Sequence, residues 1–293
     1  MRLKARAPLR LLFGGDWTDV EAFAAIEGGA ALTGAILPYT QGSISRADDG
    51  NLRLPRRAVA STLTYTTGIP VNSGLGVETA EVLVWLALVK TATANTAARR
   101  DIASEVCDIS QYLGIVSGKH DVFASALGGI NLLSSGQTTE CERIDLSPSF
   151  QQALLESLLV AYTGSRDLVT RSTVSEEWTR GEPSVVAGLR ELKRLTIDMA
   201  EALKNQDLNG LGALMAQHAS VQRSMSRRPS AVDDICRTAL EAGATAAKPD
   251  GDGGSVILLA PEGREQLKQR LNRAGVSTFE VAFDFYGVYV MKG

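Results

Sequence analysis

The chain has 293 residues and a mass of 31.1 kDa, enough for one large domain or two ordinary ones. Its 44% hydrophobic and 22% charged residues are average for a globular protein, and a net charge of −3 gives no basic footprint for nucleic acid. No apolar run reaches the roughly 20 residues of a membrane helix, and two histidines with three scattered cysteines exclude a His-rich or Cys-rich metal site.

The start of the chain predicts no secretory leader. The apolar run at 9–13 is too short for the core of a signal peptide, and Arg10 interrupts it. Cys107, Cys141 and Cys236 have no regular spacing, which is typical of reduced thiols. We therefore expect a cytoplasmic protein that binds neither nucleic acid nor membrane.

Strand-like and helix-like patterns alternate through the first half. In chain order they predict a strand at 9–13, a helix at 17–27 capped by Thr18 or Asp19, a turn and strand at 28–37, an edge strand within 54–69, helices at 78–93 and 95–113, and a segment at 122–127 that continues from a turn. The polar, turn-rich stretch at 134–140 marks the end of the first predicted unit, residues 1–148.

The second half, residues 149–293, repeats this alternation. It predicts helices at 150–158, 182–204, 207–225, 230–242 and 261–274, and strands at 160–162, 256–259, 279–285 and 288–291. The long helix at 182–204 carries an apolar stripe typical of a core helix. Strands interleaved with helices in both halves favour two α/β layers that share a cleft.

A glycine turn precedes the helix at 78–93. Residues 70–80 read Pro-Val-Asn-Ser-Gly-Leu-Gly-Val-Glu-Thr-Ala. Gly74 and Gly76 allow a tight turn and a close approach of backbone N–H groups to a ligand, and the first N–H groups of a helix attract anions. The stretch is either a phosphate cradle or a glycine turn before a buried helix.

Three further glycine-containing segments accompany this turn. They read Ala7-Pro-Leu-Arg-Leu-Leu-Phe-Gly-Gly-Asp-Trp-Thr-Asp19, Gly114-Ile-Val-Ser-Gly-Lys-His-Asp121 and Lys248-Pro-Asp-Gly-Asp-Gly-Gly-Ser-Val256. In this order and spacing the four segments resemble the GHMP kinases, and most of all the sugar 1-kinases of the D-glycero-D-manno-heptose 7-phosphate kinase and fucokinase type. The resemblance implies an α+β, two-lobed fold, with an S5-like N-terminal half and a ferredoxin-like C-terminal half around a cleft.

The resemblance also implies catalytic residues. Asp121 matches the aspartate that accepts the proton of the attacking hydroxyl, although an aspartate at such a turn also suits a helix N-cap. Arg10 stands where the family places a group that pairs with this aspartate and holds it ionised; the alternative is a surface arginine.

Further positions match the substrate and nucleotide sites of the family. Substrate contacts are expected from Thr18, Asp19, Lys119, His120, Gly251, Gly253 and Gly254, and nucleotide contacts from Asn72, Ser73, Gly74, Leu75, Gly76, Val77 and Thr79. The alternatives are a helix cap at Asp19, solvated turn charges at Lys119 and His120, and a plain loop before Val256.

Two positions depart from the family pattern. The family usually carries Gly-Leu-Gly-Ser-Ser, whose second serine helps to hold Mg²⁺, and a Mg²⁺-binding glutamate about eleven residues before the catalytic aspartate. Here Glu78 follows the glycine turn, and Ser110 stands where the glutamate is expected. Either Glu78 and Thr79 ligate the metal instead, or the nucleotide site is degenerate, because a glutamate at a helix start repels phosphate unless a cation intervenes.

The sequence thus supports two functional hypotheses. The first is a kinase that uses ATP and Mg²⁺ to phosphorylate a hydroxyl, expected to be the anomeric one, of a heptose-like sugar or sugar phosphate. The second is a GHMP-fold protein that binds a sugar, a nucleotide or a protein partner without phosphoryl transfer. A monomer or homodimer is expected in both cases.

Overall fold

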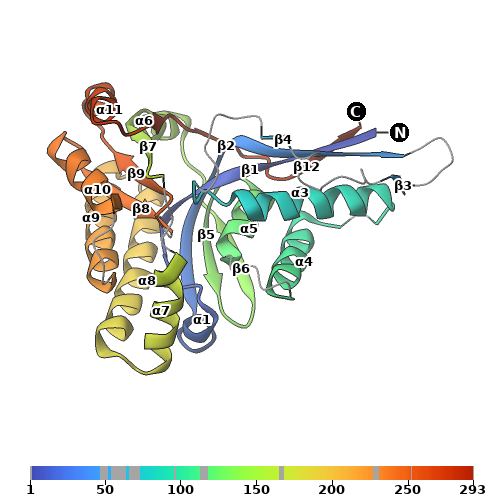
Figure 1. Ribbon diagram of the computed structural model, residues 1–293, viewed down its shortest axis with the longest axis horizontal. Coiled ribbons are helices and arrows are strands. Elements are labelled where there is room, and N and C mark those ends of the chain that lie inside the picture. The colour runs from blue at the N-terminus through green and yellow to red at the C-terminus, as the bar shows by residue number, and fades with distance from the viewer. Residues whose placement is uncertain are drawn as a thin grey trace.

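The computed structural model describes residues 2–46, 52–53, 64–65, 73–95, 97–112, 118–164, 168–226, 231–251 and 253–292. Its strands form two antiparallel sheets, and helices pack beside both of them (Figure 1). This is the α+β, two-lobed fold that the sequence predicted. Within the described part of the chain, no helix is both long enough and apolar enough to cross a bilayer.

The larger sheet contains both ends of the chain. Its strands are β1 (Arg2–Gly14), β2 (Gly29–Arg46), β3 (Leu52–Arg53), β4 (Thr64–Tyr65), β5 (Ile130–Ser135), β6 (Thr139–Arg143), β11 (Ala282–Phe283) and β12 (Tyr289–Lys292). The order is β12-β1-β2-β5-β6, and β3, β4 and β11 also pair with β2. The last two strands therefore return to the sheet that the N-terminus begins, and the predicted division at residue 148 stays a prediction.

The smaller sheet belongs to the second half of the chain. Its strands are β7 (Leu158–Tyr162), β8 (Ala246–Asp250), β9 (Ser255–Leu259) and β10 (Thr278–Phe279), in the order β10-β7-β9-β8. All five residues of β9 are buried, as expected for a strand with an apolar sequence covered on both faces. The strand predicted at 279–285 is instead two short strands, one in each sheet.

The helices follow the apolar patterns of the sequence with one exception. They are α1 (Glu21–Glu27), α3 (Val77–Ala92), α4 (Arg99–Tyr112), α5 (Lys119–Leu127), α6 (Pro148–Ser157), α7 (Leu168–Thr179), α8 (Pro183–Lys204), α9 (Leu208–Met225), α10 (Ala231–Glu241) and α11 (Arg264–Arg273). Helix α7 was not predicted, because its sequence has no apolar stripe at helical spacing. The stripe predicted on α8 is core: Leu189, Leu192 and Leu195 are fully buried.

Three local predictions need correction or stay open. Helix α1 begins at Glu21 with Val20 as its N-cap, and no side chain caps it, so neither Thr18 nor Asp19 has that role. The polar stretch at 134–140 is the end of β5, a turn and the start of β6, and so lies inside one hairpin. Most of the edge strand predicted within 54–69 lies outside the described residues, and Thr64–Tyr65 pairs with β2.

A buried lysine joins the two sheets. Lys248 on β8 is fully buried; its Nζ lies 2.7 Å from Oδ2 of Asp16, which follows β1, and donates to the carbonyl of Leu12 on β1 at 3.0 Å. Buried charges are tolerated only when they are paired, so this contact fixes the end of β1 against β8.

We expect Lys248→Met to lower the free energy of unfolding by about 3–5 kcal/mol, because Asp16 would be left as a buried charge without its lysine. Adding Asp16→Asn should recover most of this loss. Urea unfolding of both variants is the measurement. A loss below about 1 kcal/mol in the single variant would contradict a structural role for this ion pair.

Candidate active site

A cavity of about 960 Å³ opens where the N-terminal ends of α3 and α5 meet the C-terminal end of α4. It is lined by residues from five parts of the chain: Asp19, Val20, Glu21, Ala24 and Ala25; Gly74, Gly76, Glu78 and Thr79; Cys107, Asp108, Ser110, Gln111, Lys119 and Asp121; Ser135, Gly136 and Gln137; and Arg171, Ser172 and Ser175. Its volume lies within the range of small-molecule sites. Three of the four segments singled out in the sequence contribute to it.

The glycine turn forms one wall of this cavity. Gly74 and Gly76 have φ of 78° and 77°, a left-handed conformation that favours glycine. Gly76 is the N-cap of the 16-residue helix α3, and no side chain caps the first N–H groups of that helix. This end of α3 can therefore receive an anion through its backbone.

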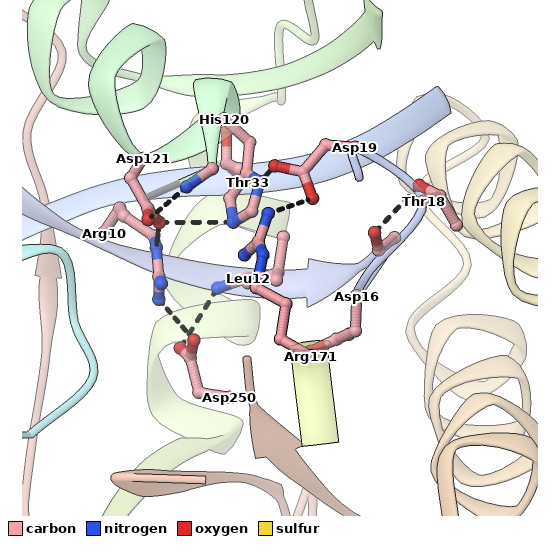
Figure 2. A network of polar contacts seen from close by, with 12 residues as sticks. Arg10, Leu12, Asp16, Thr18, Asp19, Thr33, His120, Asp121, Arg171 and Asp250 are labelled. Atoms are coloured by element: carbon pink, nitrogen blue, oxygen red, sulfur yellow. Dashed lines mark hydrogen bonds and ion pairs between the residues drawn. The ribbon is translucent and has the colours of Figure 1, made fainter. Parts of the chain in front are cut away.

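Asp121 lies on the cavity wall in the first turn of α5. Gly118 is the N-cap of this helix, so the alternative of an N-cap aspartate is wrong; Asp121 is three residues further on, and its Oδ2 accepts the Gly118 N–H at 3.3 Å. The residue is 8% exposed. Its Oδ1 pairs with Arg10 Nε and lies 3.2 Å from His120 Nε2 (Figure 2).

The ionisation of Asp121 follows from these contacts. Burial alone would raise the pKa of the Asp121 carboxyl, but the charges of Arg10 and His120 outweigh it and hold the pKa well below its ordinary value. The expected pairing of Arg10 with Asp121 is therefore confirmed. Arg10 is 3% exposed, so the alternative of a surface arginine is wrong.

His120 lies between two carboxylates. Its Nδ1 is 2.7 Å from Asp19 Oδ2, and Arg171 Nη2 donates to the other oxygen of Asp19 at 2.9 Å. Burial disfavours the charged imidazole, but Asp19 and Asp121 outweigh burial and raise the pKa of His120 to about 10. His120 is therefore an imidazolium at neutral pH, with both ring N–H groups directed at carboxylates (Figure 2).

Two predicted substrate contacts have other roles. Thr18 is fully buried, and its hydroxyl lies within hydrogen-bond distance of the Gly15 and Ala30 carbonyls, so it shapes the turn after β1. His120 is 3% exposed and does not line the cavity, so it is not a solvated turn charge. Its ring instead contacts Asp19 and Asp121, both of which do line the cavity. Lys119, in contrast, is exposed and lines the cavity, as does Asp19.

Only some of the residues predicted to contact the nucleotide line the cavity. Gly74, Gly76 and Thr79 line the cavity, whereas Leu75 and Val77 point into the core, and only their backbone can meet a ligand. Ser73 is fully buried, and its hydroxyl has no hydrogen-bond partner among the described residues. Asn72 lies outside the described residues.

The second glycine loop approaches the first. A Cβ on Gly74 would lie 3.3 Å from the backbone nitrogen of Gly254. Gly251 and Gly253 have positive φ and line a smaller pocket of about 50 Å³ instead of the large cavity. Their contact with a substrate stays a prediction.

The structure adds three residues that the sequence analysis did not assign to the site. Arg171 lies on the unpredicted helix α7, and no motif marks it. Asp250 lies in the Lys-Pro-Asp-Gly segment, where the sequence gives no sign of a partner. Its contact with Arg10 is visible only in the structure, where β8 lies beside β1. Ser110 stands where the family pattern has a glutamate. The residue is 3% exposed and lines the cavity, and its buried hydroxyl has no hydrogen-bond partner among the described residues.

The candidate metal ligands face the same cavity. Glu78 is exposed and Thr79 is buried, and Ser110 on α4 lines the same cavity. The described part of the chain contains no cluster of three His, Cys, Asp or Glu side chains suited to a metal ion. A metal here would therefore need ligands from a bound nucleotide in addition to these oxygens.

The fold and one segment of the chain are similar to known proteins. Residues 199–277 match the family described as GHMP kinases C terminal. The structure is similar to that of a D-glycero-D-manno-heptose 1-phosphate kinase from Bacteriodes thetaiotaomicron, with a TM-score of 0.79, 19% identity and 99% of each chain covered. It is also similar to the Methanococcus jannaschii mevalonate kinase, with a TM-score of 0.71, 16% identity, and 96% of this chain and 98% of that one covered. Residues 199–277 thus carry a GHMP kinase C-terminal domain, and the fold of the chain is similar to that of these two kinases.

Two curated relatives are sugar kinases of Arabidopsis thaliana. Probable glucuronokinase 2 is 28% identical over 216 residues, and glucuronokinase 1 is 27% identical over 222 residues. Each match covers 71% of this chain but only 59% of the relative, so the chain spans about three fifths of their length.

The charge on His120 makes a pH-dependent prediction. Because the pKa of His120 is raised, its stabilising charge is fully present below about pH 6.5 and is lost as the pH rises through about 10. We expect His120→Gln to lower the free energy of unfolding by about 3–5 kcal/mol at pH 6 and by much less at pH 10. Urea unfolding of both proteins across this range is the measurement.

The other histidine provides the control. Burial lowers the pKa of His218 to about 3, so His218 stays neutral throughout this range. The effect of His218→Gln should therefore change little between pH 7.5 and 10, where this histidine is neutral in both the folded and the unfolded chain. A His120→Gln effect that is equally flat would contradict a charged His120.

Proposed function

We propose that this protein is a kinase that transfers the γ-phosphoryl group of ATP to a hydroxyl of a sugar or sugar phosphate. The observation that carries the proposal is that one cavity contains both an ionised, positioned carboxylate, Asp121, and an uncapped helix N-terminus behind a glycine turn. The first suits a nucleophilic hydroxyl, and the second suits the phosphates of a nucleotide.

In this proposal ATP lies along the glycine turn and supplies the phosphoryl group. Asp121 accepts a hydrogen bond from the acceptor hydroxyl and so directs its oxygen at the phosphorus. Because the transition state of phosphoryl transfer is loose, the proton moves late, and orientation matters more than a strong base. Lys119, exposed on the same wall, supplies a positive charge toward the transferring group.

The cavity oxygens fit a magnesium ion that is shared with the nucleotide. Mg²⁺ is typically held by one or two carboxylates together with substrate phosphates and water. Glu78 supplies a carboxylate, and Thr79 and Ser110 supply hydroxyls; the buried Ser110 hydroxyl without a described partner is the kind of group that a ligand satisfies. With the metal bound, Glu78 would no longer oppose phosphate at the start of α3.

The acceptor in this proposal is a sugar with an anionic substituent, phosphorylated at its anomeric hydroxyl. The relatives named as glucuronokinases and the structural similarity to a heptose phosphate kinase support this class. Lys119 and Arg171 on the cavity wall offer positive charge to a carboxylate or a phosphate. A coupled ADP-release screen against free sugars, uronic acids and sugar phosphates identifies the acceptor.

One observation favours a second candidate function. Glu78 lies in the first turn of α3, where a nucleotide phosphate would bind. If no metal binds there, the carboxylate opposes phosphate, and the protein would bind a sugar or a partner without turnover. A cytoplasmic setting and a monomeric or dimeric state belong to both candidates; all three cysteines are free.

The proposed role of Asp121 is tested by Asp121→Asn. We expect kcat to fall by about 10²–10⁴ while ATP affinity stays nearly unchanged, because Asp121 orients the acceptor and not the nucleotide. Asp108→Asn is the matched control, since Asp108 is an exposed aspartate on the same cavity wall. Near-normal kcat in a folded Asp121→Asn protein would remove Asp121 from the reaction.

The metal proposal is tested by Glu78→Gln. If Glu78 ligates Mg²⁺, the variant should bind ATP about tenfold or more weakly at limiting Mg²⁺, and excess Mg²⁺ should restore the affinity. Calorimetric titration of ATP at several Mg²⁺ concentrations is the measurement, with Glu21→Gln, an exposed glutamate across the cavity, as control. Equal or tighter binding without metal, together with no turnover in the parent, would favour the second function.

A further inference from the structure

The guanidinium of Arg10 is shared between two buried carboxylates. Its Nε pairs with Asp121 and its Nη1 with Asp250, and Arg10 and Asp250 are 3% and 0% exposed (Figure 2). Asp121 lines the cavity, but Asp250 does not. Asp250 can therefore affect the proposed reaction only through its contact with Arg10.

Asp250 is itself fixed by the backbone around it. It is the last residue of β8, and its Oδ2 accepts the N–H of Leu12 on β1 at 3.2 Å. Two residues before it, Lys248 donates to the carbonyl of the same Leu12 at 3.0 Å. Alternating side chains of β8 thus bind both the N–H and the carbonyl of one residue of β1, two residues after Arg10.

We propose that Asp250 is a positioning residue for the phosphoryl transfer described above: it holds the Arg10 guanidinium in the orientation that presents Nε to Asp121. The inference rests on the proposed function. A guanidinium is a planar fork with fixed donor directions, so a carboxylate on one of its nitrogens sets the direction of the others.

The second carboxylate also limits the charge that Arg10 gives to Asp121. A guanidinium paired with Asp121 alone would interact more strongly with that carboxylate and leave it a weaker acceptor for a substrate hydroxyl. By dividing the guanidinium between two anions, Asp250 lets Arg10 orient Asp121 while the carboxylate keeps its ability to accept a hydrogen bond.

The kinetic test is a double-variant cycle with Asp250→Asn and Arg10→Lys. We expect Asp250→Asn to lower kcat by about 10–100-fold, with the KM for ATP changed less than about twofold, and to lower kcat less than about threefold when lysine replaces Arg10. A residue that acts only on stability would give the same fold-change in both backgrounds, and that result would overturn the proposal.

Asp284→Asn is the matched control. Asp284 is 3% exposed and holds the Tyr39 hydroxyl and the N–H groups of Tyr286 and Gly287, and it does not line the cavity. Its loss should reduce the melting temperature without coupling to Arg10→Lys. If Asp250→Asn does not fold, Asp250→Glu replaces it in the cycle. Its displaced carboxylate should lower kcat when Arg10 is present and have little effect when lysine replaces Arg10.

A second readout needs no turnover. The Arg10 Nε–H signal in ¹⁵N-labelled protein is assigned by its absence in Arg10→Lys. Asp250→Asn should shift this signal and speed its exchange with solvent by about tenfold or more, whereas Asp284→Asn should leave it unchanged. An unchanged signal in Asp250→Asn overturns the positioning role. A shifted signal in a protein that phosphorylates no acceptor would sustain the positioning and refute the proposed function instead.

Discussion

The pairing of Arg10 is the contact on which the site depends. A buried guanidinium is stable only when its charge is matched, and here the matching carboxylates come from α5 and β8, two elements more than a hundred residues apart in the chain. The three elements must therefore fold together before the charges are satisfied. This requirement places Asp121 at the cavity wall and brings the smaller sheet against the larger one.

The same principle extends across the site. Four cationic side chains, Arg10, His120, Arg171 and Lys248, face four carboxylates, those of Asp16, Asp19, Asp121 and Asp250. Because the charges balance, the network can be buried, and the paired cations hold the pKa values of Asp19 and Asp121 below their ordinary range, where burial alone would raise them. The cavity then receives acceptor and nucleotide beside a carboxylate whose position is already fixed.

Sequence reasoning predicted the parts of this arrangement that local chemistry encodes. Gly74, Gly76 and Asp121 stand in motifs whose spacing resembles a known superfamily, and the apolar stripe of α8 predicted its burial. Asp250, Arg171 and the role of His120 could not be predicted, because each acts through a partner distant in sequence. Thr18 was misassigned because a hydroxyl next to a motif residue does not reveal which way it points.

Arg10 and His120 hold Asp121 as a carboxylate. This is tested most directly by following the ¹³Cγ resonance of Asp121 in labelled protein from pH 8 to pH 4, with Asp121→Asn used for assignment. Asp121 should give the chemical shift of an ionised carboxylate throughout this range, because its pKa lies well below it. A titration of this resonance between pH 4 and pH 8 would instead mean that the paired cations do not control the ionisation of Asp121.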